Sequence, residues 1–325
     1  MKFTIYQESR TGMRANNEDR LAYCYSREAL LMVVADGMGG HYYGEVAAQI
    51  AVQTLTDAFP REFKPRMRDP FMFLQKGMLN AHRAILDFAG QHRLLDSPRT
   101  TCVACVVQNS VAYWAHSGDS RLYLLRNGRV LAQTRDHSRV RLLVDQGVIS
   151  EEQMPGHPDR NKIYGCLGGQ QKPEIEYSRK ATLETGDVLV LCTDGVWSVL
   201  PADILAVSLK TTDPADAVPV LLGQAEARGG PHADNLSMIA VQHAPDVDAV
   251  LHEHRAIETV FLEQRRVARG IDAALARHRL DRVPRHQPDQ EEREQRHPDE
   301  GRDDEADAGE EETQHRARGR AGGRI

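Results

Sequence analysis

The chain of 325 residues is long enough for one large domain or two small ones. Its formal net charge of −6, with no concentrated basic face, argues against general nucleic-acid binding. The N-terminus lacks the apolar stretch of a signal peptide, and no run approaches the length of a membrane span, so we expect a cytoplasmic protein.

A polar loop between the first two predicted strands carries several charged side chains. Residues 2–8 alternate between apolar and polar and predict a strand, and residues 21–25 predict a second one. The loop between them contains Arg14, Glu18 and Asp19.

The next predicted strand ends on a carboxylate beside glycines. Residues 30–35 are an unbroken apolar run, typical of a strand buried on both faces. Asp36 ends this run, and three glycines follow almost at once. Glycines let the backbone approach a ligand that a side chain would block. A helix is predicted over residues 43–58, so Asp36 is either a ligand-binding carboxylate or only a helix cap.

Meandering strands occupy the middle of the chain. Asn127-Gly128 is the strongest hairpin signal, and helices are predicted before and after the strands. This order indicates an α+β layered domain rather than a parallel doubly wound sheet. The elements predicted here are a helix over 70–90 and strands over 100–107, 111–116, 122–125 and 130–133.

Two further acids stand at strand ends. Residues 137–169 are irregular. A helix is predicted near residues 139–146, and the stretch 156–169, rich in Pro, Gly and charge, predicts a surface flap of the type that borders a site. Asp194 follows the predicted strand at 187–192, and Asp234 precedes the final strand. Helices are predicted between them, over residues 201–209 and 214–227.

The composition changes after residue 244. Apolar residues recur at helical spacing between charges, so residues 245–280 are predicted to form an amphipathic helical extension. This helix could pack on the domain or pair with a partner helix. Residues 281–325 are almost all charged, Pro, Gly or Gln, and we expect them to be disordered because they bury too little apolar area.

Cys102 and Cys105 form a CxxC spacing that could indicate metal or redox chemistry. They lie in a predicted strand, where residues three apart face opposite sides, so structural burial is the better interpretation. The five cysteines are scattered among apolar runs, which indicates free thiols in a reducing compartment.

The strand-end acids form a candidate metal site. Asp36, Asp194 and Asp234 flank apolar strands, and Asp119 lies between two strands. A buried carboxylate is costly unless it is paired or binds a metal. Oxygen-only ligands favour Mg²⁺ or Mn²⁺ over Zn²⁺. Spacing alone leaves open that these are ordinary turn acids.

Six motifs occur in an order that resembles a known family. They are RANNED (14–19), VADGMGGHYYGE (34–45), AHSGDSRLYLLR (115–126), DHS (136–138), GDVLVLCTDGVW (186–197) and ADN (233–235). From about residue 3 to 242 the chain resembles the bacterial branch of the metal-dependent, type 2C serine/threonine protein phosphatases. The resemblance implies a four-layer α-β-β-α sandwich of two antiparallel sheets flanked by helices. Residues 1–244 would be the catalytic domain, followed by the helical extension (245–280) and the charged tail (281–325).

The resemblance also implies a binuclear Mg²⁺ or Mn²⁺ site. Asp36 would bridge both ions, the Gly37 carbonyl would be a further ligand, and Asp194 and Asp234 would complete the shell of the first ion. Glu18 would lie at the second ion, directly or through water.

Four more residues receive roles from the resemblance. Asp19 would order the water molecules around the second ion, and Asn235 belongs to the same motif as Asp234. Bacterial relatives often hold a third, weaker ion, whose aspartate matches Asp119. Arg14 matches the arginine that grips the substrate phosphate, for which a bidentate guanidinium is suited.

The implied reaction is attack by a water shared between two cations, whose pKa is depressed. No covalent phosphoenzyme is needed. Animal members carry a histidine directly after the first DG, where this chain has Met38, so the proton donor for the leaving group is unassigned. His41 lies nearby and either positions the turn or takes a catalytic part.

Two functions from different classes remain. The first is a metal-dependent phosphatase acting on phosphoserine and phosphothreonine in proteins, with a small phosphoester as the variant substrate. The alternative is a catalytically weak, phosphatase-like binding module that acts through its C-terminal helix and tail. The three strand-end acids favour the first. The expected partners are a phosphorylated protein, a cognate serine/threonine kinase and a partner for the C-terminal helix.

Overall fold

The computed structural model describes residues 2–38, 43–63, 66–154, 156–244 and 258–261. The chain divides into two units, Met1–Asp272 and Ala273–Ile325, and the second lies outside the described residues. The expected disorder of residues 281–325 and nearly all of the predicted helical extension lie outside them too. All elements below belong to the first unit.

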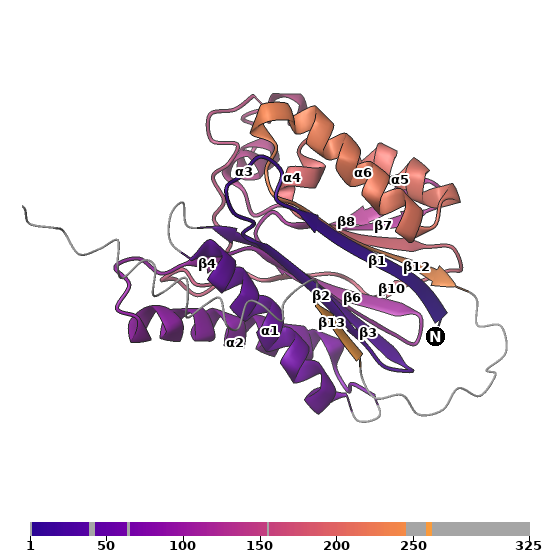
Figure 1. Ribbon diagram of the computed structural model, residues 1–325, viewed down its shortest axis with the longest axis horizontal. Helices are drawn as coiled ribbons and strands as arrows, with labels where there is room; N and C mark the ends of the chain where they lie inside the picture. Colours follow the sequence, from indigo (N-terminus) through magenta and orange to yellow (C-terminus); the bar gives the residue numbers. More distant parts are fainter. Residues whose placement is uncertain (1, 39–42, 64–65, 155, 245–257, 262–325) are drawn as a thin grey trace, which may run out of the picture. The chain divides into compact units, whose positions relative to one another are not determined.

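Two antiparallel sheets form the centre of this unit (Figure 1). The smaller sheet has the order β1 (Lys2–Arg10), β12 (Leu236–Ala244), β11 (Val188–Cys192), β7 (Arg121–Arg126) and β8 (Arg129–Gln133). The larger sheet has the order β10 (Ala181–Thr182), β6 (Val111–Ser117), β5 (Cys102–Gln108), β3 (Ala29–Met38), β2 (Asp19–Tyr25) and β13 (Glu258–Phe261). Two short strands complete it: β4 (Arg99–Thr100) pairs with β3, and β9 (Glu176–Tyr177) pairs with β6.

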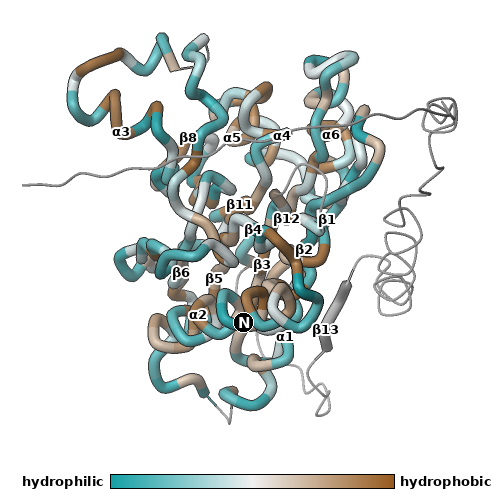
Figure 2. Tube along the Cα trace, turned by 90° about the vertical axis from the view of Figure 1, so that its left-hand side faces the viewer, coloured by the Kyte–Doolittle hydropathy of each residue, from teal (hydrophilic) through white to brown (hydrophobic). Residues whose placement is uncertain are grey.

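Helices cover the outer face of each sheet. The larger sheet is covered by α1 (Gly44–Glu62) and α2 (Pro70–Gln91). The smaller sheet is covered by α4 (Asp194–Trp197), α5 (Ala202–Thr211) and α6 (Pro214–Gly229). Figures 1 and 2 show these helical layers on opposite sides of the strands. The four-layer α-β-β-α sandwich is therefore confirmed. The segment that follows β8 contains α3 (Arg139–Asp145) and a 3₁₀ turn (Glu151–Gln153), and a second 3₁₀ turn (Gly230–His232) follows α6.

The apolar run of β3 is buried on both faces, as its composition predicts. Leu31 and Val33 belong to the core under α1 and α2, whereas Leu30 and Met32 belong to the core between the sheets. This alternation follows from the two-residue period of a strand. Such a strand is held rigidly from both sides, which fixes the position of the carboxylate at its end.

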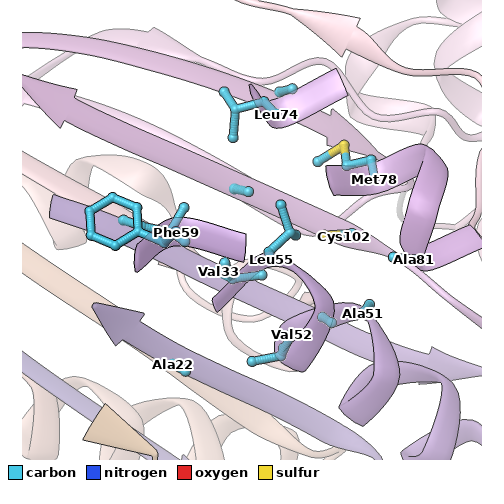
Figure 3. Close-up of a cluster of buried hydrophobic side chains, with 14 of the residues drawn as sticks. Ala22, Val33, Ala51, Val52, Leu55, Phe59, Leu74, Met78, Ala81 and Cys102 are labelled. Atoms are coloured by element: carbon cyan, nitrogen blue, oxygen red, sulfur yellow. The ribbon is translucent and has the colours of Figure 1, made fainter. Parts of the chain in front are cut away.

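The outer core joins α1 and α2 to the larger sheet. Leu55 and Phe59 of α1 and Leu74 and Met78 of α2 belong to one buried cluster with Val33 of β3, and Val33 lies beside Leu55 (Figure 3). The N-terminus of α2 is capped: the Asp69 side chain accepts a hydrogen bond from the Met72 amide, and Pro70 occupies the first turn.

The two cysteines of the CxxC spacing face opposite sides of β5. Cys102 belongs to the core under the helices, and Cys105 belongs to the core between the sheets. Burial raises the pKa of the Cys102 thiol to about 12, so it stays protonated at neutral pH. The interpretation of these residues as structural thiols agrees with this arrangement, and all five cysteines are free.

The prediction of a helix is wrong at residues 258–261. These residues form β13, which pairs antiparallel with β2 at the edge of the larger sheet, with Glu258 opposite Tyr25 and Phe261 opposite Ala22. The physical reason is twofold: Thr, Val and Phe favour strands, and β2 would otherwise present an unpaired edge. Apolar spacing alone did not distinguish this short strand from a turn of helix.

Candidate active site

Carboxylates from both sheets gather at one end of the sandwich. Asp36 lies near the end of β3, directly opposite Asp19 at the start of β2. Asp194 is the first residue of α4, just after β11, and Asp234 lies just before β12. Asp119 lies in the turn between β6 and β7. The charges of the other four all raise the pKa of Asp36, which places the five carboxylates in one electrostatic neighbourhood.

The backbone of Asp36 takes part in three hydrogen bonds. Its amide donates to Thr101 Oγ1 at 3.1 Å, and its carbonyl accepts from the Thr101 amide and from Thr100 Oγ1, both at 2.9 Å. Thr101 Oγ1 in turn bonds to Ser120 Oγ at 2.7 Å. These contacts fix the Asp36 main chain, so its carboxylate projects from a rigid support.

Two glycines let the chain pass close to Glu18. The Gly37 amide donates to the Glu18 carbonyl at 3.2 Å, and a Cβ at Gly37 would collide with the Gly44 carbonyl. A Cβ at Gly44 would collide with the carboxylate of Glu18 itself. Both positions therefore need glycine because the strand end, the start of α1 and Glu18 are in close contact.

Asp19 is buried, with 3% of its surface exposed, and carries an unsatisfied oxygen. Its Oδ2 accepts a hydrogen bond from Thr193 Oγ1 at 2.8 Å, whereas Oδ1 has no hydrogen-bond partner among the described residues. Burial raises the pKa of Asp19 to about 7, while the hydroxyls of Ser237 and Thr193 oppose this change. A buried oxygen without a donor is costly, so this side chain fits a place beside a hydrated cation.

Asn235 ties the loop after β1 to the start of β12. Its Oδ1 accepts from the Glu18 amide at 2.8 Å, and its Nδ2 donates to the carbonyls of Thr11 at 2.8 Å and Asn16 at 2.9 Å. These three bonds hold the loop that presents Arg14 and Glu18. Asn235 thus acts on the site by positioning other groups.

Arg14 is exposed at the site and pairs with an acid. Its Nη2 lies 2.7 Å from Asp234 Oδ2, and 60% of its side-chain surface is open to solvent. The hydrogen bond and charge of Asp234 raise the pKa of Arg14, so it stays cationic. An exposed guanidinium beside the acids can contact an incoming phosphate.

The pKa values of several acids of the site are raised, by burial first and then by neighbouring carboxylates. Burial, followed by the charge of Asp234, raises the pKa of Asp194 to about 6. Burial also raises the pKa values of Asp119 and Asp36, in both cases together with neighbouring carboxylates. Burial and then Glu45 raise the pKa of Glu18. Clustered carboxylates of this kind need a cation, and an all-oxygen set fits Mg²⁺ or Mn²⁺.

A cleft of about 740 Å³ opens beside the acids. Its walls include Arg14, Asp119, Asp194 and Asp234. The stretch predicted to be a flap (156–169) contributes Arg160 and Asn161 to another wall, and the residues before it contribute Ser138, Val140, Arg141, Glu151 and Met154. This segment therefore borders the candidate site, as its composition predicts.

Sequence reasoning missed the groups that support the acids. Thr101 and Thr193 are buried and bond to Asp36 and Asp19 from 65 and 174 residues away in the sequence. The guanidinium of Arg121 forms a double hydrogen bond with Asp136 and lies 3.6 Å over the Trp197 ring, which builds another wall of the cleft. Thr193, Arg121, Asp136 and Trp197 lie inside the six motifs, whereas Thr101 lies outside all of them. His41 lies outside the described residues.

Known proteins are similar to this chain in sequence and in fold. The sequence profile of the family described as Protein phosphatase 2C matches residues 7–220. The serine/threonine phosphatase stp of Listeria welshimeri is 32% identical over 243 residues, which cover 73% of this chain and 94% of that protein. Within the described part of the chain, no helix has the length and hydropathy to cross a membrane.

Solved structures agree with the sequence relatives. The serine/threonine phosphatase of S. agalactiae superimposes with a TM-score of 0.68 at 28% identity, over 74% of this chain and 99% of that one. The catalytic domain of the phosphatase PstP, in complex with two manganese ions, gives a TM-score of 0.63 at 30% identity, over 75% of this chain and 99% of that one.

The sandwich with acids at the shared end of its sheets defines a metal-dependent phosphatase. The chain belongs to the protein phosphatase 2C family of serine/threonine phosphatases. It is therefore an enzyme whose substrates are phosphoproteins, and the comparisons favour this function over the binding-module alternative.

Proposed function

We propose that this chain removes phosphate from phosphoserine and phosphothreonine by direct attack of water, with two Mg²⁺ or Mn²⁺ ions held by its strand-end acids. One observation carries the proposal: the fixed main chain of Asp36 and the buried and half-buried acids around it form a cluster of negative charge beside an open cleft. When bound, the cations supply acidity to water and offset charge on the phosphoryl oxygens.

Individual residues receive roles from their positions. Asp36 would bridge the two ions, with the Gly37 carbonyl beside it, and Asp194 and Asp234 would hold the first ion. Glu18 would hold the second, directly or through water. The support is that each of these groups offers oxygen, as Mg²⁺ and Mn²⁺ require.

Three other residues would act around this centre. The free Oδ1 of Asp19 would accept a hydrogen bond from a water at the second ion. Asp119 would hold a third, more weakly bound ion. Burial and then the nearby charge of Asp194 raise the pKa of Asp119. Arg14 would orient the phosphoryl group, since it is cationic and lies at the rim of the cleft. For His41 the proposal keeps two roles: a catalytic part, or positioning of the turn after Asp36.

The domain boundaries and partners are part of the proposal. Residues 1–244 would be the catalytic domain, residues 245–280 an extension that touches the sheet through β13, and residues 281–325 a charged tail. The extension and tail would recruit a partner such as a serine/threonine kinase. We also propose a cytoplasmic location, which the five free cysteines support.

The substrate class can be tested with matched peptides. One peptide sequence is prepared with phosphoserine, phosphothreonine or phosphotyrosine, and phosphate release is measured with Mn²⁺ present. The proposal predicts turnover of the first two and little of the third. Equal turnover of all three would contradict it, and turnover of only a small phosphoester would favour the variant substrate.

A further inference from the structure

A second cluster of potential metal ligands contains none of the acids of the candidate active site. It consists of His116 near the end of β6, His137 just before α3, and Glu176 of β9. One ligand atom from each residue lies within 4.8 Å of the other two. His116 and Glu176 are direct cross-strand partners in the larger sheet, so the backbone pairing itself brings them together.

The cluster is buried on one side and open on the other. His116 and His137 are each 2% exposed, and the Glu176 side chain is half exposed. A cation can therefore reach the two rings past the carboxylate. Burial lowers the pKa values of both histidines, which keeps the rings neutral, while Glu174 and Glu176 oppose this effect at His137. Neutral imidazole is the form that binds a metal.

The hydrogen bonds of His116 prepare it as a ligand. Its Nε2 lies 2.7 Å from the Arg135 carbonyl and must carry the proton, which leaves a lone pair on Nδ1. A metal-binding histidine usually donates its other N–H to a carbonyl or carboxylate in this way, and that bond fixes the tautomer.

His137 faces Glu176 directly. Its Nε2 lies 3.6 Å from Glu176 Oε2, close to the separation of about 3.4 Å between two tetrahedral ligands that each lie about 2.1 Å from an ion. Its Nδ1 accepts from the Gly118 amide at 3.4 Å, longer than an ordinary hydrogen bond. Movement of the ring proton from Nε2 to Nδ1, which frees Nε2 to bind a metal, therefore loses only this weak hydrogen bond.

We propose that His116 Nδ1, His137 Nε2 and a Glu176 oxygen bind one Zn²⁺, with water as the fourth ligand. Two imidazoles and one carboxylate form a ligand set typical of Zn²⁺, whereas Mg²⁺ and Mn²⁺ prefer oxygen alone. The acids of the candidate active site and this cluster thus select different ions.

The bound ion would connect the larger sheet to the segment that borders the cleft. The His137 carbonyl accepts from the Tyr164 amide at 2.9 Å, and the His137 ring stacks on Tyr164 with centroids 5.4 Å apart. A cation held by β6, β9 and His137 would therefore restrain this wall of the cleft. We infer a structural or regulatory role for the site, separate from the reaction itself.

The test measures Zn²⁺ binding in the full-length chain that carries Asp36→Asn, so that the candidate active site takes up less metal. Equilibrium dialysis against Zn²⁺ compares Glu176→Gln with Glu62→Gln, a change of an exposed glutamate at the end of α1. Zn²⁺ bound anywhere else on the chain is common to both variants.

We expect Glu176→Gln to lose one high-affinity Zn²⁺ per chain, with affinity at this site reduced at least about tenfold. Glu62→Gln should keep the ion, and Zn²⁺ should raise the Tm of Glu62→Gln more than that of Glu176→Gln. A second variant, His137→Gln, should reproduce the loss. Equal Zn²⁺ binding by Glu176→Gln and Glu62→Gln would show that the cluster is a hydrogen-bonded histidine pair and would overturn the proposal.

Discussion

Asp19 and Asp36 face each other on adjacent antiparallel strands, at the point where β2 begins and β3 nears its end. Asp19 is held by Thr193 from the smaller sheet, and Asp36 is held by Thr100 and Thr101 from the larger one. The hydrogen bond between Asp19 and Thr193, which directly follows β11, therefore connects the two sheets at the candidate metal centre. Because Asp19 is buried and Asp36 is half-buried, their charge state links metal binding to the stability of the fold.

The pH dependence of stability follows from this pair and from Asp194. The folded pKa values are about 7 for Asp19 and about 6 for Asp194, above an unfolded value of about 4. The folded state thus binds more protons. Without metal, the stabilising contribution is fully present below about pH 4 and is lost as pH rises through the folded values.

This can be measured as Tm against pH in excess chelator. We expect the wild type to lose Tm between about pH 4 and pH 7, and Asp19→Asn to lose less, because it removes one of the titrating acids. With Mn²⁺, the metal-induced rise in Tm should grow over the same range, since deprotonated acids bind the cation better. Identical pH profiles for the wild type and Asp19→Asn would argue against this assignment.

Alanine substitutions test which glycines lie where a Cβ has no room and which lie in open space. Gly37→Ala would force a Cβ into the Gly44 backbone, so we expect a loss of about 1–3 kcal/mol in unfolding free energy and loss of activity. Gly44→Ala would meet the Glu18 carboxylate and would also approach the Gly37 carbonyl carbon to 2.9 Å, so both activity and stability should fall. The control is Gly90→Ala in α2, where the space is open and a small stabilisation is expected.

Urea unfolding and phosphatase assays on the three glycine variants provide the check. Equal effects of Gly37→Ala and Gly90→Ala would show that the close approach around Glu18 is unimportant.

Much of the fold was predictable from local patterns. Strand β3 shows in an unbroken apolar run, and the hairpin between β7 and β8 shows in Asn127-Gly128. The candidate site was predictable at Asp36, Asp194 and Asp234 because each flanks an apolar strand. Thr101 and Thr193 were not predictable, because their bonds depend on tertiary distances that no local pattern encodes. Strand β13 was missed because four residues are too few to show a period.

Asn235 should control the position of the loop that carries Arg14 and Glu18. Asn235→Ala removes all three loop hydrogen bonds, so we expect lower kcat/KM and a loss of about 1–3 kcal/mol in unfolding free energy. Asn235→Asp keeps the acceptor for the Glu18 amide but loses both donations. Steady-state kinetics should therefore rank the wild type first, and an unchanged KM and kcat in both variants would rule out a positioning role.

The extension should protect the edge of the larger sheet. A chain truncated after residue 244 lacks β13, so β2 gains a free edge, while the acids and the cleft remain. We expect small-substrate turnover to be retained but self-association to increase. Light scattering after size-exclusion chromatography measures this.

A point variant makes the same test at full length. Val260→Pro removes a backbone donor from β13 and should weaken its pairing with β2, with the same tendency to associate. Collapse of the catalytic domain on truncation would show instead that the extension is needed for folding.

The central claim is that the acids around Asp36 hold the metal that hydrolysis requires. The most direct measurement is hydrolysis of p-nitrophenyl phosphate with Mn²⁺, with excess chelator, and by Asp36→Asn, each on protein shown to be folded by circular dichroism. We predict turnover that needs Mn²⁺ and falls by at least about a hundredfold in Asp36→Asn, since removal of an essential charged group costs several kcal/mol in the transition state. Turnover that persists in chelator, or an Asp36→Asn variant as active as the wild type, would contradict the account.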